Sequence, residues 1–176
     1  MRALALCACA LLVLAAGSSA RVRTEPSAGT LSIERGRGLV VLEIRGAVLG
    51  RLASGTIRVV DITPRDRFQA HVLGRRLVEE PLGPRSVLYR GQGMRFRMIG
   101  GGYRISIRGE GLSLSAVGRG TVTLVGERRT STEDAGVFSL EVDCSEALEL
   151  CLPLPTEPER YVLGPRQNEG DSGRTR

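Results

Sequence analysis

Apolar and polar positions alternate along most of the chain between residues 30 and 163, in runs short enough for single strands. Alternation with a period of two is typical of a β-strand that buries one face and exposes the other. The clearest runs lie between residues 94 and 125 and read MRFRMI, YRISIR, LSLSAV and TVTLV. Because no stretch has the spacing of a long amphipathic helix, the pattern predicts an all-β protein.

Glycines separate these runs at a constant interval. The interval is nine residues, and a Gly-x-Gly begins at each of Gly91, Gly100, Gly109 and Gly118. Glycine adopts the positive φ of a tight hairpin turn without strain. The predicted fold class is therefore an antiparallel meander that forms a sandwich or flattened barrel, with Gly-x-Gly hairpin turns at nine-residue spacing.

These hairpins imply a definite register. The strand at 94–98 would pair with the strand at 103–107, and the latter with 112–116. Apolar side chains would then share one face, whereas Arg97 would lie directly opposite Arg104 on the other. The alternative is a parallel β-solenoid with two nine-residue units in each coil; its calcium-binding form is excluded because the repeats lack the required aspartate.

The first 20 of the 176 residues have the plan of a signal peptide, with Arg2, an apolar run and small residues before a cleavage near Ala20. This predicts a secreted or cell-surface protein. Residues 21–29 are expected to be an extended lead-in and 30–163 a single β domain, with 130–163 as its C-terminal segment. Residues 164–176 are expected to be disordered. No later apolar run is long enough to span a bilayer.

Two cysteines remain beyond the leader, Cys144 and Cys151. In an exported chain such a pair predicts a disulfide that pins the C-terminal segment. A metal site would need further ligands, but the chain has one histidine and no other cysteine after the leader. We therefore expect neither a metal nor a cofactor.

Charge is unevenly distributed. All 25 basic residues are arginine; residues 35–129 hold 18 arginines against 7 acids, whereas residues 130–176 hold 4 against 10. Three interpretations stay open: the arginines bind an anionic cell-wall polymer or lipid head groups, they pair with the acidic C-terminal segment of a purely structural domain, or they simply keep their heads in water. The candidate anion-binding residues are Arg95, Arg97, Arg104 and Arg108.

Catalysis and nucleic-acid binding have weaker signals. A hydrolase could use His71 with Asp61 or Asp66, but there is no G-x-S-x-G and the DITPRD stretch that holds both acids is typical of a turn. We therefore expect no enzymatic activity. With three Phe, three Tyr and no Trp, the chain lacks the aromatic residues on which single-stranded nucleic acids stack.

The stretch SAVGRGTVTLVGE resembles the glycine-punctuated meanders of exported bacterial proteins. The resemblance implies a bacterial protein of the cell envelope or exterior, and it implies no particular activity.

Overall fold

The computed structural model describes residues 29–63, 70–130 and 135–164. These residues form six strands and one short 3-10 helix, η1, and contain no α-helix. The elements are, in chain order, β1 (Gly29–Asp61), β2 (His71–Gly83), β3 (Ser86–Gly126), β4 (Val137–Ser139), η1 (Leu148–Leu150), β5 (Leu152–Pro153) and β6 (Glu159–Leu163).

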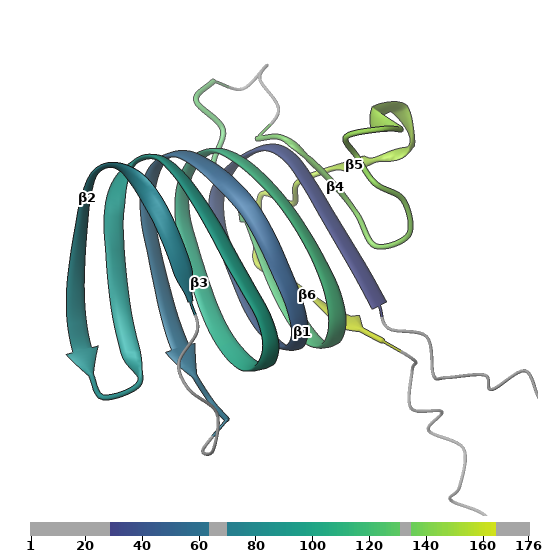
Figure 1. The fold of residues 1–176 in the computed structure, drawn as a ribbon. Helices are drawn as coiled ribbons and strands as arrows, with labels where there is room; N and C mark the ends of the chain where they lie inside the picture. The colour runs from purple at the N-terminus through teal and green to yellow at the C-terminus, as the bar shows by residue number, and fades with distance from the viewer. Residues whose placement is uncertain (1–28, 64–69, 131–134, 165–176) are drawn as a thin grey trace, which may run out of the picture.

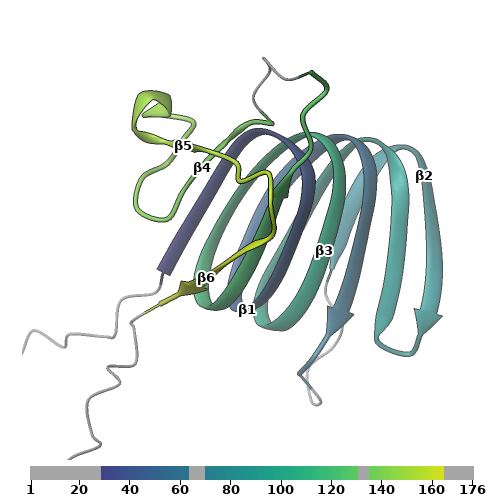
Figure 2. The same cartoon turned by 180° about the vertical axis from the view of Figure 1, so that it is seen from behind.

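Strands β1 and β3 wind around a common axis as a flattened coil (Figures 1 and 2). Each of them pairs with two stretches of the other, always antiparallel: Val40 lies between Ile107 and Leu124, and Ile107 lies between Val40 and Ile57. Val40 and Ile57 therefore occupy successive turns, and one turn takes 17 residues (57 minus 40). The sheet has the order β2-β3-β1-β4-β5, with β6 paired to β3, and does not close into a barrel.

The flattened coil has two layers joined by bends, as in a sandwich. We call the first layer the stretches 30–34, 48–52, 71–73, 94–98 and 112–117, and the second layer the stretches 39–45, 56–60, 78–82, 86–90, 103–108 and 121–125. Glycines lie between these stretches and are paired with one another across the sheet. One such row is Gly91, Gly55, Gly109, Gly38 and Gly126, and a second is Gly29, Gly118 and Gly46.

The glycines are required where the bent strands meet. A Cβ on Gly55 would lie 2.7 Å from the Cα of Gly109, and a Cβ on Gly109 would lie 2.9 Å from the Cα of Gly55. Both residues also have a positive φ, a backbone conformation that residues other than glycine rarely adopt. The regular spacing in the sequence thus marks the two bends of each turn.

The interior between the layers is apolar, and the predicted faces are confirmed. The alternate apolar side chains of 94–98, 103–107 and 112–116 point inward and are buried, whereas the arginines between them are exposed. Each fully buried aliphatic side chain contributes roughly 1.5–3 kcal/mol to folding. The buried set includes Met94, Phe96, Met98, Tyr103, Ile105, Ile107, Leu112, Leu114 and Ala116.

The prediction of an all-β, antiparallel, flattened fold is confirmed, but the predicted hairpins are wrong. Residues 94–98, 103–107 and 112–116 are consecutive lengths of the single strand β3, and Ile105 pairs with Leu42 and Val59 of β1. A bend every nine residues is equally compatible with a hairpin and with a coil as a local structure. In this protein the stretches of β3 pair with the long strand β1 and not with one another. The parallel solenoid is also wrong, because every described strand pair is antiparallel.

The two ends of the coil differ. At one end β4 pairs with β1, β6 pairs with β3, and β5 pairs with β4. The predicted Cys144–Cys151 disulfide is present there, with the two Cα atoms 5.9 Å apart. At the other end β2 forms the edge, pairing with β3 on one side and with no described strand on the other.

Some predictions fall outside this description. The signal peptide, most of the lead-in, the tail beyond Gly164 and Asp66 are not among the described residues. No helix in the described part of the chain is long and apolar enough to cross a membrane.

Candidate functional site

The outer face of the first layer carries rows of side chains that run across the strands. In one row Arg97 lies between His71 and Leu49, and Leu49 is followed by Ser115 and Ser32. In the next row Arg95 lies between Leu73 and Arg51, and Arg51 is followed by Ser113. The coil therefore collects, on one surface, residues that are distant in the sequence.

Three arginines lie side by side in these rows, and we call Arg51, Arg95 and Arg97 the arginine cluster. Arg51 and Arg95 are directly opposite each other on neighbouring strands, and Arg97 is two residues further along β3 on the same face. All three are exposed. Like charges in directly opposed positions destabilise a sheet, so this arrangement has an electrostatic cost.

Two members of the cluster have no partner in the described part of the chain. Arg95 and Arg97 make no ion pair or hydrogen bond with any residue that the structure describes. Arg51 has a long contact, with its Nη2 3.9 Å from Glu34 Oε2. The two guanidinium groups on β3 thus have their donors available to solvent or to a ligand.

The cluster borders hollows on the surface. A shallow groove of about 490 Å³ runs from Arg95 and Phe96 past Arg51 to Asp143 and Ser145. On the other side of Arg95 a hollow of about 320 Å³ is lined by His71, Leu73, Phe96 and Arg97. Arg95 therefore stands between two adjoining depressions, both open to solvent.

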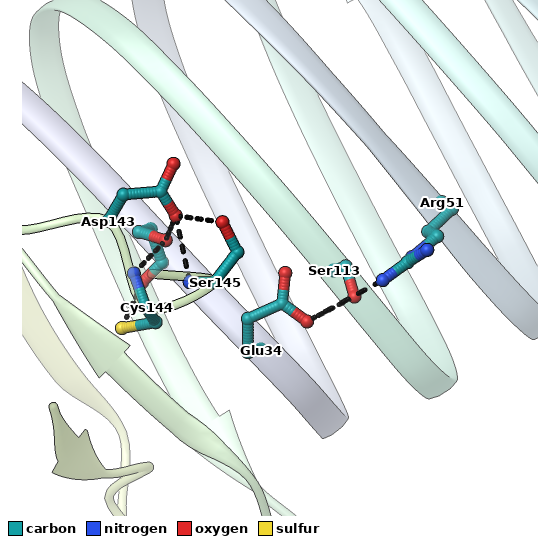
Figure 3. A network of polar contacts seen from close by, with 7 residues as sticks. Glu34, Arg51, Ser113, Asp143, Cys144 and Ser145 are labelled. Carbon is teal, nitrogen blue, oxygen red and sulfur yellow. Dashed lines mark hydrogen bonds and ion pairs between the residues drawn. The ribbon is translucent and has the colours of Figure 1, made fainter. Parts of the chain in front are cut away.

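The far end of the groove is lined by hydroxyls and carboxylates (Figure 3). Ser113 Oγ donates to Glu34 Oε2 at 2.6 Å, and Arg51 reaches toward the same carboxylate. Asp143 Oδ1 accepts hydrogen bonds from the backbone N–H and the hydroxyl of Ser145, both at 2.9 Å. These donors, with a weaker contribution from Ser32, lower the pKa of Asp143 below its ordinary value. The groove thus changes from cationic to polar and acidic along its length.

Ser32 attaches the C-terminal segment to β1. Its Oγ accepts from the Cys144 N–H at 2.9 Å and donates to Asp143 Oδ1 at 3.1 Å. Ser32 is buried, which makes these bonds important for placing the loop closed by the disulfide. Its role is therefore to position one wall of the groove.

The predicted set of four arginines is divided between the two layers. Arg95 and Arg97 lie in the first layer, whereas Arg104 and Arg108 lie in the second and are already paired: Arg104 with Glu43 at 2.9 Å and Arg108 with Glu127 at 2.8 Å. The predicted opposition of Arg97 and Arg104 is wrong, because Arg104 lies opposite Glu43 and Val60. The acids that pair with these two arginines are Glu43 of β1 and Glu127, the residue after β3, and not members of the segment 130–163.

The candidate hydrolase residues are placed apart. His71 is exposed at the start of β2, opposite Arg97 in the first layer. Asp61 is buried at the end of β1, opposite Tyr103, and accepts a hydrogen bond from the Thr63 N–H at 2.7 Å in a local turn. Asp66 lies outside the described residues. Among the described residues, no group of three His, Cys, Asp or Glu side chains has a geometry that could hold a metal ion.

Sequence reasoning missed Arg51 and the polar half of the groove. Arg51 lies between Gly50 and the buried Leu52, so its outward direction can be read locally. Its position opposite Arg95 depends on the pairing of β1 with β3, which no local signal contains.

No protein-family model, curated protein or solved structure matches the chain. Functional assignment therefore depends on the geometry described above.

Proposed function

We propose that the protein is an exported, non-catalytic binding module that holds the phosphate or carboxylate groups of an anionic surface through Arg51, Arg95 and Arg97. The observation that carries this proposal is the arginine cluster, in which the exposed guanidinium groups of Arg95 and Arg97 lie beside that of Arg51 and have no partner among the described residues. Such an arrangement costs stability in the free protein, and an anionic ligand would offset that cost.

The spacing of the cluster suits a ligand with repeated anionic groups. Opposed residues such as Arg51 and Arg95 have Cβ atoms roughly 5 Å apart, and residues two apart on one strand are separated by roughly 7 Å. Each guanidinium can bind a carboxylate or phosphate through two parallel hydrogen bonds. Further along the groove, Ser115 can donate or accept a hydrogen bond, whereas Ser113 and Ser145 already donate to carboxylates and can accept from uncharged polar groups of the same ligand.

Other functions have less support. A hydrolytic site would need a base next to a nucleophile, and His71 and Asp61 belong to different layers of the coil. Single-stranded nucleic acid would need exposed aromatic side chains, but Phe96, the aromatic residue that lines the groove, is 3% exposed. A purely structural domain, the second candidate, is favoured by the pairing of Arg104 and Arg108 with neighbouring acids, but it leaves Arg95 and Arg97 without a role.

Export is part of the proposal. The Cys144–Cys151 disulfide is compatible with an oxidising compartment outside the cytosol. Determination of the N-terminal residue of the protein recovered from culture medium or from the cell surface tests it; export predicts a start close to residue 21.

Retention on defined anionic matrices tests the binding function. We expect the protein to be retained on immobilised polyphosphate or polyuronate, to elute earlier as salt increases, and to pass through a neutral glucan matrix. Arg95→Ser with Arg97→Ser should weaken retention about tenfold or more. The matched control is Arg104→Ser with Arg108→Ser, which removes the same charge from arginines that are already paired. Equal retention of the two double variants would show that only net charge matters, and the proposal would be abandoned.

A further inference from the structure

Exposed aliphatic side chains gather beside the arginine cluster on the same outer face. Ile99 and Val117 lie directly opposite Ala47, one on each side, and Leu49 is two residues further along β1 on that face. Their exposed fractions are 49% for Ile99, 45% for Val117 and 44% for Leu49. We call these three residues the aliphatic patch. Apolar side chains that are neighbours on a surface, unlike single scattered ones, mark a site of association.

Exposed arginines lie beside the aliphatic patch. Arg97 is directly opposite Leu49, and Arg45 lies opposite Arg119 just beyond the bend that follows the patch. All three of these arginines are exposed. The acids that line the groove of this layer, Glu34 and Asp143, lie toward its other end. The patch therefore has a cationic border.

The shape of the coil favours a flat partner. The bends of successive turns line up along each long edge of the coil (Figures 1 and 2). The patch is next to one such edge, with Arg97 on the first-layer side and Arg45 on the second-layer side. Arginines on both sides of a straight, convex edge can reach a planar charged surface at the same time.

We propose that the aliphatic patch and the arginines beside it dock on a bilayer of anionic lipids. This inference rests on the proposed function and narrows its anionic groups to lipid phosphates. Aliphatic side chains enter the boundary between head groups and acyl chains, while guanidinium groups bind phosphates at the level of the head groups. A soluble polymer would use the arginines alone, and it would provide no apolar surroundings for Leu49, Ile99 and Val117.

Flotation with vesicles tests the inference. The vesicles contain phosphatidylglycerol and phosphatidylcholine, and the same protein preparations are applied to immobilised polyphosphate. Leu49→Ser with Ile99→Ser and Val117→Ser should weaken vesicle binding about tenfold or more and leave polyphosphate retention unchanged. The matched control is Leu150→Ser with Leu152→Ser and Val162→Ser, which changes three exposed aliphatic residues elsewhere. It should change neither vesicle binding nor polyphosphate retention. Circular dichroism checks that each variant is folded.

The outcomes separate this inference from the proposed function. Vesicle binding that survives the triple substitution in the patch overturns the inference, as does a wild-type protein that binds polyphosphate but not vesicles; the arginine function then stands and a polymer becomes the ligand. An equal loss on vesicles and on polyphosphate also overturns it. If the double variant Arg95→Ser with Arg97→Ser binds both vesicles and polyphosphate as strongly as the wild type does, the proposed function is wrong, and the inference that rests on it is wrong as well.

Discussion

Arg51 of β1 lies directly opposite Arg95 of β3 on the outer face of the first layer, although 44 residues (95 minus 51) separate them in the sequence. Neither belongs to a strong ion pair: Arg51 has a 3.9 Å contact with Glu34, and Arg95 has no partner among the described residues. Two like charges in this position oppose folding and favour an anion between them.

Reversing one of these charges should therefore stabilise the fold. Arg95→Glu places a carboxylate opposite Arg51, and we expect the free energy of unfolding to rise by about 0.5–1 kcal/mol. Urea unfolding at low salt measures the change. Arg97→Glu, which introduces the same charge opposite Leu49 and His71, is the control and should give a smaller gain. If the two variants have the same unfolding midpoint, the opposition of Arg51 and Arg95 has no energetic consequence.

The paired glycines at the bends should tolerate no side chain. A methyl group on Gly109 would meet the backbone of Ser54 and Gly55, so we expect Gly109→Ala to destabilise the protein by about 2–4 kcal/mol. Thermal unfolding measures the loss. Gly83→Ala is the control, because no atom lies within 4 Å of the added group. A Gly109→Ala protein as stable as Gly83→Ala would mean that the strands do not approach closely at this bend.

The hydrogen bonds to Asp143 should make the attachment of the C-terminal segment sensitive to acid. Because the folded pKa of Asp143 lies below the ordinary 3.8, its stabilising contribution is complete well above that pH and decreases as the pH falls toward the folded value. Asp143→Asn should flatten this part of the profile. Hydrogen exchange at Cys144 and Ser145 between pH 5 and 3 follows the attachment locally. The same acid-induced loosening in wild type and variant would exclude Asp143 as its cause.

The free edge of β2 should be protected against association by its own residues. The strand contains Pro81, which has no N–H to donate, a positive φ at Arg76 where its register shifts, and Glu79 opposite the buried Tyr89. Such features block the addition of another strand. We expect Glu79→Val with Pro81→Val to associate as concentration rises, as measured by sedimentation velocity. Glu141→Val with Glu146→Val, which changes two exposed residues outside the described strands, is the comparison. If both double variants sediment as the wild type does, these residues do not protect the edge.

The inward and outward directions of side chains could be predicted from the sequence. The alternation along a strand makes Ile105 point inward and Arg104 outward. The glycines between Met98 and Tyr103 change the phase of this alternation, so that both of these residues point inward. Alternation and glycine positions are local properties of the sequence. The same holds for the disulfide, since Cys144 and Cys151 are the two cysteines that follow residue 9. The exposure of Arg95 and Arg97 also follows from this pattern.

The partners of each strand could not be predicted in this way. A glycine bend after nine residues can return a strand upon itself or carry it over to the other layer, and the local energies are similar. The choice depends on whether β1, whose residues are between 26 (Val60 to Ser86) and 89 (Gly29 to Gly118) positions away from their partners in β3, is available to fill the space between successive turns. The alternation of side chains determined what is buried in this protein. Only the winding of β1 with β3 decided that Arg51 joins Arg95 and Arg97, and that Arg104 meets Glu43, because pairing between distant strands is a property of the whole chain.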